Sequence, residues 1–168
     1  MGLRSAQVII ELHNTLISIK SGLDRLVSIF SEYYRGISKN VTFGHKKIKI
    51  DGTVSYTSFL SFCYQMKDKD EVFSYILSEY EKWIANCVEP RDAVVHYGDF
   101  FNLYEFFADG CTEMPISINQ STNENLEINM RKLQDYVEKY YVFMNNIIKH
   151  LWRIELASVL NNNSDNTN

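Results

Sequence analysis

The segment from Pro90 to Tyr97 holds the residues of this sequence best suited to chemistry. Arg91 lies five residues before His96, and the preceding proline is typical of the first turn of a helix. An imidazole can accept or donate a proton near neutral pH, and a guanidinium can hold a phosphate and stabilise negative charge on its oxygens. This pair is therefore the minimal set of groups for cleaving RNA without a metal.

Asp92 and Tyr97 are the neighbours that could support this pair. Asp92 lies four residues before His96, a spacing at which two helical side chains meet, so its carboxylate can accept a hydrogen bond from the imidazole and fix its tautomer. A carboxylate in a first helical turn is also favourable against the helix dipole, whatever His96 does. Both interpretations of Asp92 stay open. Tyr97 is interpreted as a packing or rim residue on which an RNA base could stack.

An Arg followed by Asp and then by a His within a few residues is also a family signature. Through Arg91, Asp92 and His96 the chain resembles the HEPN superfamily of small all-helical domains. The resemblance implies a metal-independent endoribonuclease, used as a toxin or phage-defence effector and held in check by a cognate antitoxin or regulatory protein. The tyrosine that some members carry two residues after the His is absent, because that position is Gly98 and the tyrosine comes one residue early.

The spacing of the motif bears on assembly. Residues five apart are separated by about 140° around a helix axis, so Arg91 and His96 do not share one narrow stripe. We expect two copies of the chain to face each other, as the resemblance implies, with Arg91 and His96 from both protomers in one composite site. A homodimer is then part of the functional hypothesis. The structural alternative is that Arg91 pairs with an acidic surface neighbour while His96 is a half-buried packing residue.

Two other classes of protein remain open. A non-catalytic HEPN-like helical module would bind a nucleotide or a protein partner with a motif that performs no chemistry. A purely structural helical bundle would be favoured if the protein were monomeric.

Composition limits the class of protein. The 168 residues, 45% hydrophobic and 14% aromatic, suit one domain with a substantial core. A net charge of −4 disfavours a protein that coats nucleic acid over a broad face but permits a local basic groove. The sequence lacks a run of about 18 apolar residues and a secretory signal, so we expect a cytoplasmic protein without membrane attachment.

The cysteines and histidines indicate neither disulfides nor a metal site. The cysteines are odd in number and far apart, which favours buried small hydrophobic residues over a disulfide framework. No histidine belongs to a pair with metal-ligand spacing, so we predict no metal cofactor. The residues concerned are Cys63, Cys87, Cys111, His13, His45, His96 and His150.

The first half of the chain is predicted to be helical around a small insertion. Apolar residues at helical spacing predict one long helix over residues 5–38, ending near Gly36. Alternation and an Asp-Gly pair predict a β-hairpin within 41–56. Two further helices are expected over 57–66 and 72–87.

The second half is expected to end in another long helix. Element boundaries between 97 and 122 are not assigned, and the polar stretch 111–123 is interpreted as a loop, either without regular structure or with a short extended segment at Ile116 to Ile118. Helical spacing then predicts a helix over 123–160, and the polar tail 161–168 is expected to be disordered. The predicted architecture is therefore one all-α domain over 1–160, a bundle of four or five helices with two long helices and a small hairpin.

Three lysines in the expected hairpin form the remaining candidate for nucleic-acid binding. Lys46, Lys47 and Lys49 could contact RNA phosphates if the hairpin lies beside the motif. Lysines on a short hairpin also protect an exposed strand edge from pairing with other chains, and this is the favoured interpretation.

Overall fold

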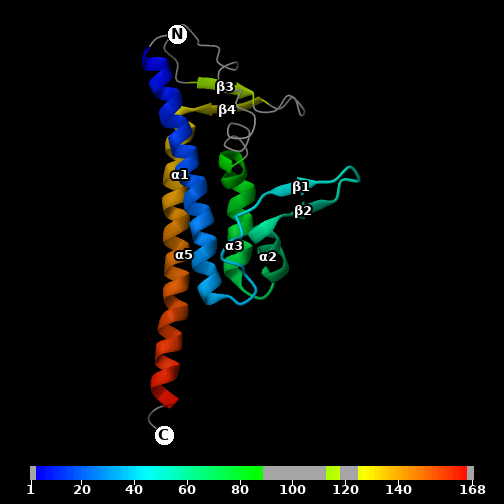
Figure 1. Ribbon diagram of the computed structural model, residues 1–168, viewed down its shortest axis with the longest axis vertical. Helices are drawn as coiled ribbons and strands as arrows, with labels where there is room; N and C mark the ends of the chain where they lie inside the picture. The colour runs from blue at the N-terminus through cyan, green and yellow to red at the C-terminus, as the bar shows by residue number, and fades with distance from the viewer. Residues whose placement is uncertain (1–2, 89–112, 118–124, 166–168) are drawn as a thin grey trace.

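The computed structural model describes the backbone of residues 3–88, 113–117 and 125–165, and the side chains of residues 14–88 and 134–160. The described chain is mostly helical, with short antiparallel hairpins (Figure 1). The predicted all-α class with a small hairpin near 41–56 is therefore confirmed.

Two long helices, α1 (Leu3–Tyr33) and α5 (Met130–Asp165), lie side by side and run in the same direction (Figure 1). They approach closely at Gly22, where a Cβ atom would overlap the hydroxyl of Tyr140 and lie 2.9 Å from its Cζ. A larger residue at position 22 would therefore require the Tyr140 side chain to shift. The helix α1 ends earlier than predicted, at Tyr33, ahead of Gly36, whose φ of +98° is a conformation that suits glycine.

The predicted hairpin is formed by β1 (Lys46–Ile48) and β2 (Val54–Tyr56), which pair antiparallel with Lys46 opposite Tyr56. The turn contains Gly52 at φ +78°, as expected for an Asp-Gly hairpin turn. The hairpin projects from the helical bundle (Figure 1).

Two shorter helical elements follow the hairpin. The helix α2 (Ser58–Met66) matches its predicted range. The helix α3 (Glu71–Glu79) begins after Asp70, whose carboxylate accepts a hydrogen bond from the Val72 backbone N–H at 3.0 Å and so caps the helix. It continues as the π-helical turn η1 (Tyr80–Ile84) and stays helical to position 88.

The start of the predicted last helix is wrong. Residues 125–129 form strand β4 (Asn125–Asn129), which pairs antiparallel with β3 (Glu113–Ser117). The physical reason lies in the sequence, because Leu126 and Ile128 alternate with polar residues at the two-residue period of a strand. The helix starts at Met130 and continues to Asp165, so the first five positions of the tail expected to be disordered are helical.

The hydrophobic core lies between α1, α2, α3, η1 and α5. Cys63 and Cys87 are free thiols, 0% and 1% exposed, which confirms that they act as small core residues. The largest fully buried side chains are Trp83, Tyr80, Phe30, Phe43, Phe59, Phe73 and Phe143. This packed centre fixes the relative positions of α3 and α5, which form the walls of the candidate site.

Candidate functional site

The motif residues of the predicted active site lie outside the part of the chain that the structure describes. These are Arg91, Asp92, His96 and Tyr97. The helix that begins with α3 is described to position 88, so the motif follows it within a few residues along the chain.

The three candidate lysines have different surroundings. Lys46 is tied to η1, because its Nζ lies 2.8 Å from Glu81 Oε2 and its backbone N–H donates to Tyr80 Oη at 2.8 Å. Burial alone would raise the pKa of Glu81, but hydrogen bonds from Lys46 and Tyr56 outweigh that effect and lower it. Lys47 and Lys49 are exposed on the projecting hairpin. Lys46 therefore anchors the hairpin, and only the other two have side chains available for a ligand.

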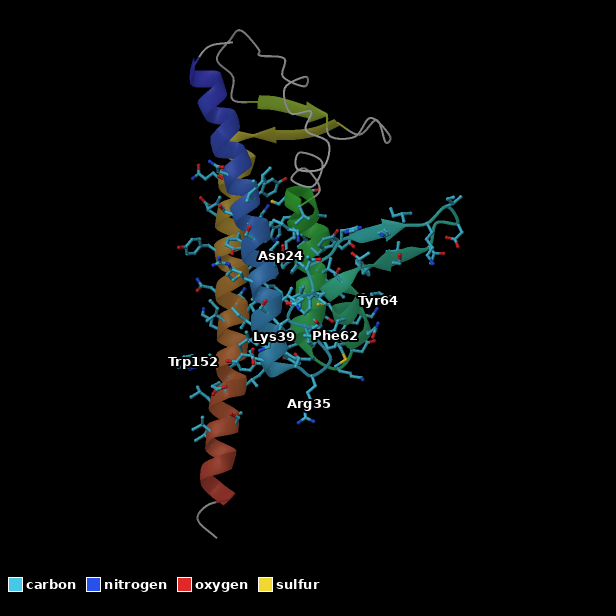
Figure 2. All side chains as sticks on the ribbon, viewed as in Figure 1. Asp24, Arg35, Lys39, Phe62, Tyr64 and Trp152 are labelled. Atoms are coloured by element: carbon cyan, nitrogen blue, oxygen red, sulfur yellow. The ribbon has the colours of Figure 1, made fainter. Side chains whose placement is uncertain are left out.

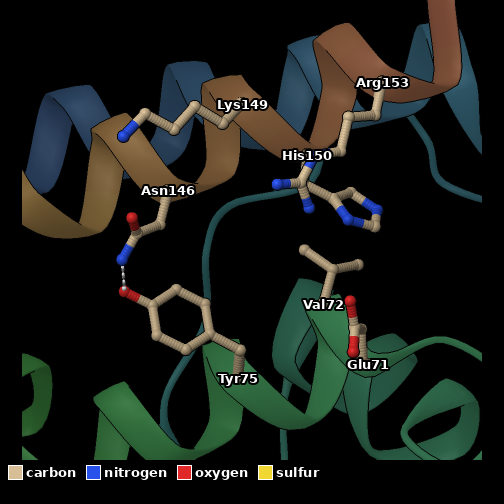
Figure 3. Close-up of a pocket in the computed structure, with 7 residues that line it drawn as sticks. All are labelled: Glu71, Val72, Tyr75, Asn146, Lys149, His150 and Arg153. Carbon is tan, nitrogen blue, oxygen red and sulfur yellow. Dashed lines mark hydrogen bonds between the residues drawn. The ribbon is translucent and has the colours of Figure 1, made fainter.

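A pocket of about 350 Å³ lies between α3 and α5 (Figure 3). Its α5 wall consists of Asn146, Lys149, His150 and Arg153. Their spacing of three, four and seven residues places them on one face of the helix. Among the described residues, Lys149 and Arg153 take part in no hydrogen bond or ion pair, and both are exposed. Two cationic groups are therefore available at this wall.

The opposite wall comes from the first two turns of α3. Glu71 is exposed and faces the α5 side chains across the pocket, while Val72 and Tyr75 supply an apolar floor (Figure 3). The hydroxyl of Tyr75 accepts a hydrogen bond from Asn146 Nδ2 at 3.0 Å, which connects the two walls. The pocket thus combines cations on one side with a carboxylate on the other.

A hydrogen-bonded cluster of Tyr34, Asp70 and His150 holds the imidazole at the edge of this pocket. Tyr34 Oη donates to Asp70 Oδ2 at 2.7 Å and lies 3.0 Å from His150 Nε2. Because the only hydroxyl hydrogen points to the carboxylate, the phenol oxygen accepts and Nε2 must carry the hydrogen. In the neutral ring, Nδ1 is then left as an acceptor.

This cluster also joins three parts of the fold. Tyr34 follows α1, Asp70 caps α3 and His150 belongs to α5. Burial and the hydrogen bond to Asp70 raise the pKa of Tyr34 well above its usual range, so the phenol keeps its proton. The structural role of connecting the helices is sufficient to explain this cluster. The same hydrogen bonds also orient His150 toward the pocket.

The sequence carried a signal for half of this site. The last predicted helix carries a second set of residues at helical spacing beside its apolar stripe, namely Asn146, Lys149, His150 and Arg153. Nothing in the sequence indicated that Asp70 and Tyr34 would reach His150, because those contacts span 80 and 116 positions. They depend on the tertiary packing.

No group of three or more His, Cys, Asp or Glu side chains within the described ranges is arranged to hold a metal ion. No described helix combines the length and apolar character needed to cross a membrane.

Comparisons with known proteins found no match: no family model, no curated protein and no solved structure is similar to this chain.

Proposed function

We propose that the protein is a metal-independent endoribonuclease of HEPN type, in which Arg91 and His96 from two protomers form a composite site. The observation that carries the proposal is the Arg-Asp-x3-His spacing itself, in which the Arg91 guanidinium precedes the His96 imidazole by five residues just after a proline. The predominantly helical fold with two long helices is compatible with it.

The proposed chemistry needs both groups. One His96 deprotonates the ribose 2′-hydroxyl, whose oxygen attacks the phosphorus and forms a cyclic phosphate, while Arg91 holds the phosphate and stabilises charge that develops on its oxygens. The P–O5′ bond breaks, and the His96 of the second protomer protonates the leaving 5′ oxygen. General acid–base catalysis of this kind contributes about a hundredfold to ten-thousandfold in rate. DNA lacks the 2′-hydroxyl and is not cleaved by this route.

An exposed apolar stripe on α5 supports the two-protomer arrangement. Val137, Ile148 and Val159 are spaced by eleven residues, as are Tyr141 and Trp152, so all five lie along one side of a nearly straight helix. Tyr141 and Trp152 are 70% and 65% exposed, and Trp152 points away from the bundle (Figure 2). Large aromatic side chains in such a stripe are typical of a protein interface. A second copy of the chain is the partner that the proposed site requires.

The test is cleavage of a labelled single-stranded RNA in chelator by purified wild-type protein and by His96→Ala. We expect the variant to lose at least about a hundredfold in rate while it remains folded. His45→Ala is the matched control, because it removes an imidazole from another part of the chain. Cleavage by His96→Ala at the wild-type rate, after removal of contaminating nucleases, would refute the assigned role.

A second candidate function is a non-catalytic helical module that binds a nucleotide or a protein partner. The pocket between α3 and α5 favours it, because its Lys149 and Arg153 carry positive charge that no described carboxylate neutralises by an ion pair. This candidate predicts ligand binding by a protein that does not cut RNA.

A further inference from the structure

The pocket between α3 and α5 has the groups needed to recognise two different parts of one ligand (Figure 3). Lys149 and Arg153 are available counter-charges for an anion. Arginine in particular matches the geometry of a phosphate, since its guanidinium can form two parallel hydrogen bonds. These two residues are one turn apart on α5, so both can reach one bound group.

Two further polar side chains of the pocket, Glu71 and His150, offer acceptors. Glu71 carries a carboxylate on the opposite wall, and the tautomer of His150 whose Nε2–H donates to Tyr34 has Nδ1 as its acceptor. A simple anion would gain nothing from these groups and would be repelled by Glu71. A hydroxyl group on the same ligand would instead donate hydrogen bonds to them.

The size of the pocket agrees with a ligand larger than a bare ion. A volume of about 350 Å³ falls at the lower end of the range typical of small-molecule sites, about 300–1,000 Å³. Tyr75 adds an apolar surface, and its position is fixed by stacking on Phe143 with ring centroids 5.8 Å apart and by the hydrogen bond from Asn146. A fixed wall of this kind lowers the entropic cost of binding.

We infer that this pocket binds a small phosphate ester that also carries hydroxyl groups, such as a sugar phosphate, with the phosphate at Lys149 and Arg153 and the hydroxyls at Glu71 and His150. The inference sharpens the second candidate function by naming the site and the ligand class. It does not depend on whether the protein cleaves RNA.

The cluster of Tyr34 and Asp70 has a positioning role in this site. Asp70 accepts from Tyr34, Tyr34 accepts from His150, and this chain of hydrogen bonds fixes both the tautomer and the orientation of the ring. Neither residue lines the pocket, so neither is expected to contact the ligand.

The experiment is titration calorimetry of the full chain with ribose 5-phosphate, adenosine monophosphate, inorganic phosphate and ribose. We expect saturable binding of the two phosphate esters, weaker binding of inorganic phosphate and none of ribose. Arg153→Gln and Lys149→Gln should each lower the affinity for the phosphate esters about tenfold, since each removes a charge-assisted contact. The stronger of the two esters identifies whether a sugar phosphate or a nucleotide is the better ligand, and either order supports the site.

Two further variants make the result specific. Arg35→Gln removes the same charge from an exposed side chain that points away from the bundle, and it should bind like wild type (Figure 2). Glu71→Gln should reduce the advantage of ribose 5-phosphate over inorganic phosphate, because the amide is a weaker acceptor and no longer repels a bare anion.

The inference is overturned if no phosphate compound binds saturably, or if Arg35→Gln weakens binding as much as Arg153→Gln. It is also overturned if ribose 5-phosphate and inorganic phosphate bind equally well to wild type. Because RNA is absent from the titration, a negative result leaves the nuclease proposal standing, and absence of RNA cleavage leaves the binding result standing.

Discussion

Replacing Tyr34 by Phe tests whether the Tyr34, Asp70 and His150 cluster stabilises the fold. The substitution removes one hydroxyl while the ring stays to stack on Phe30, at 5.5 Å between centroids, and to meet Phe73 edge-on at 4.9 Å. The lost oxygen donates to Asp70 at 2.7 Å and accepts from His150 at 3.0 Å. The effect on stability therefore reports on two polar contacts and not on packing.

The magnitude follows from the surroundings of the cluster. A hydrogen bond to a charged group contributes about 1.5–3 kcal/mol. The side chains of Asp70 and His150 are 24% and 20% exposed, so water can replace part of the hydrogen bonding that the variant loses. His150 Nε2 also lies 3.6 Å from Asp70 Oδ2, so these two side chains can interact directly when the hydroxyl is gone. We expect Tyr34→Phe to lower the free energy of unfolding by about 1–2 kcal/mol. For a chain of this length that corresponds to a melting temperature lower by roughly 2–8 °C.

The assay is urea denaturation followed by circular dichroism, with Tyr33→Phe as the matched control. Tyr33 is the preceding residue, is 37% exposed and has no hydrogen bond to any described residue, so its loss of a hydroxyl should change stability by less than about 0.5 kcal/mol. A double variant with Asp70→Asn should cost less than the sum of the single variants, because both remove one interaction. Tyr34→Phe indistinguishable from Tyr33→Phe, or strict additivity in the cycle, would refute the reasoning.

Three further predictions concern packing, titration and assembly. Gly22→Ala should lower the free energy of unfolding by about 1–3 kcal/mol because the added Cβ meets Tyr140. In a Tyr140→Leu background the same change should be neutral or stabilising. Denaturant unfolding of wild type, both single variants and the double variant tests this, and an equal loss of stability in both backgrounds would contradict the contact. Burial and Glu81 raise the pKa of Tyr56 to about 12, whereas unfolded tyrosine titrates near 10. Between those values the unfolded state binds fewer protons, so the free energy of unfolding should fall as pH rises, and less steeply in Tyr56→Phe; equal slopes would be inconsistent with this. Trp152→Glu should convert a dimer to a monomer in sedimentation experiments without loss of helix content, and a dimer that persists would exclude this stripe as the interface.

Much of the fold could be predicted because local signals agree with the packing. The helical stripe of α1, the Asp-Gly turn and the range of α2 are each encoded within a few residues, and each lies close to its predicted place. The strand β4 was missed because Leu126 fits both a two-residue period and the helical stripe that continues through Met130. Pairing with β3 decides between those periods, and that partner lies some ten residues away in sequence.

The candidate site, in contrast to the fold, depends mainly on contacts between residues far apart in sequence. The Arg91 and His96 hypothesis rests on residues close together in sequence and stays a prediction. The pocket at His150 instead needs α3 and α5 to be packed side by side, with Asp70 at the start of one and His150 well inside the other. Sequence periodicity places side chains on a face of one helix but does not say which other helix that face will meet.

The length of α5 has a consequence for measurement. At 36 residues it is about 54 Å long, and its last turns extend past the end of α1 (Figure 1). The side chains of residues 152–160 are mostly exposed, and the last five residues of the helix include Asn161, Asn162 and Asn163, which are weak helix formers. Amide hydrogens there should exchange quickly in a monomer and slowly in an assembly that covers them. Deuterium uptake along α5 therefore measures directly whether this helix contacts another chain.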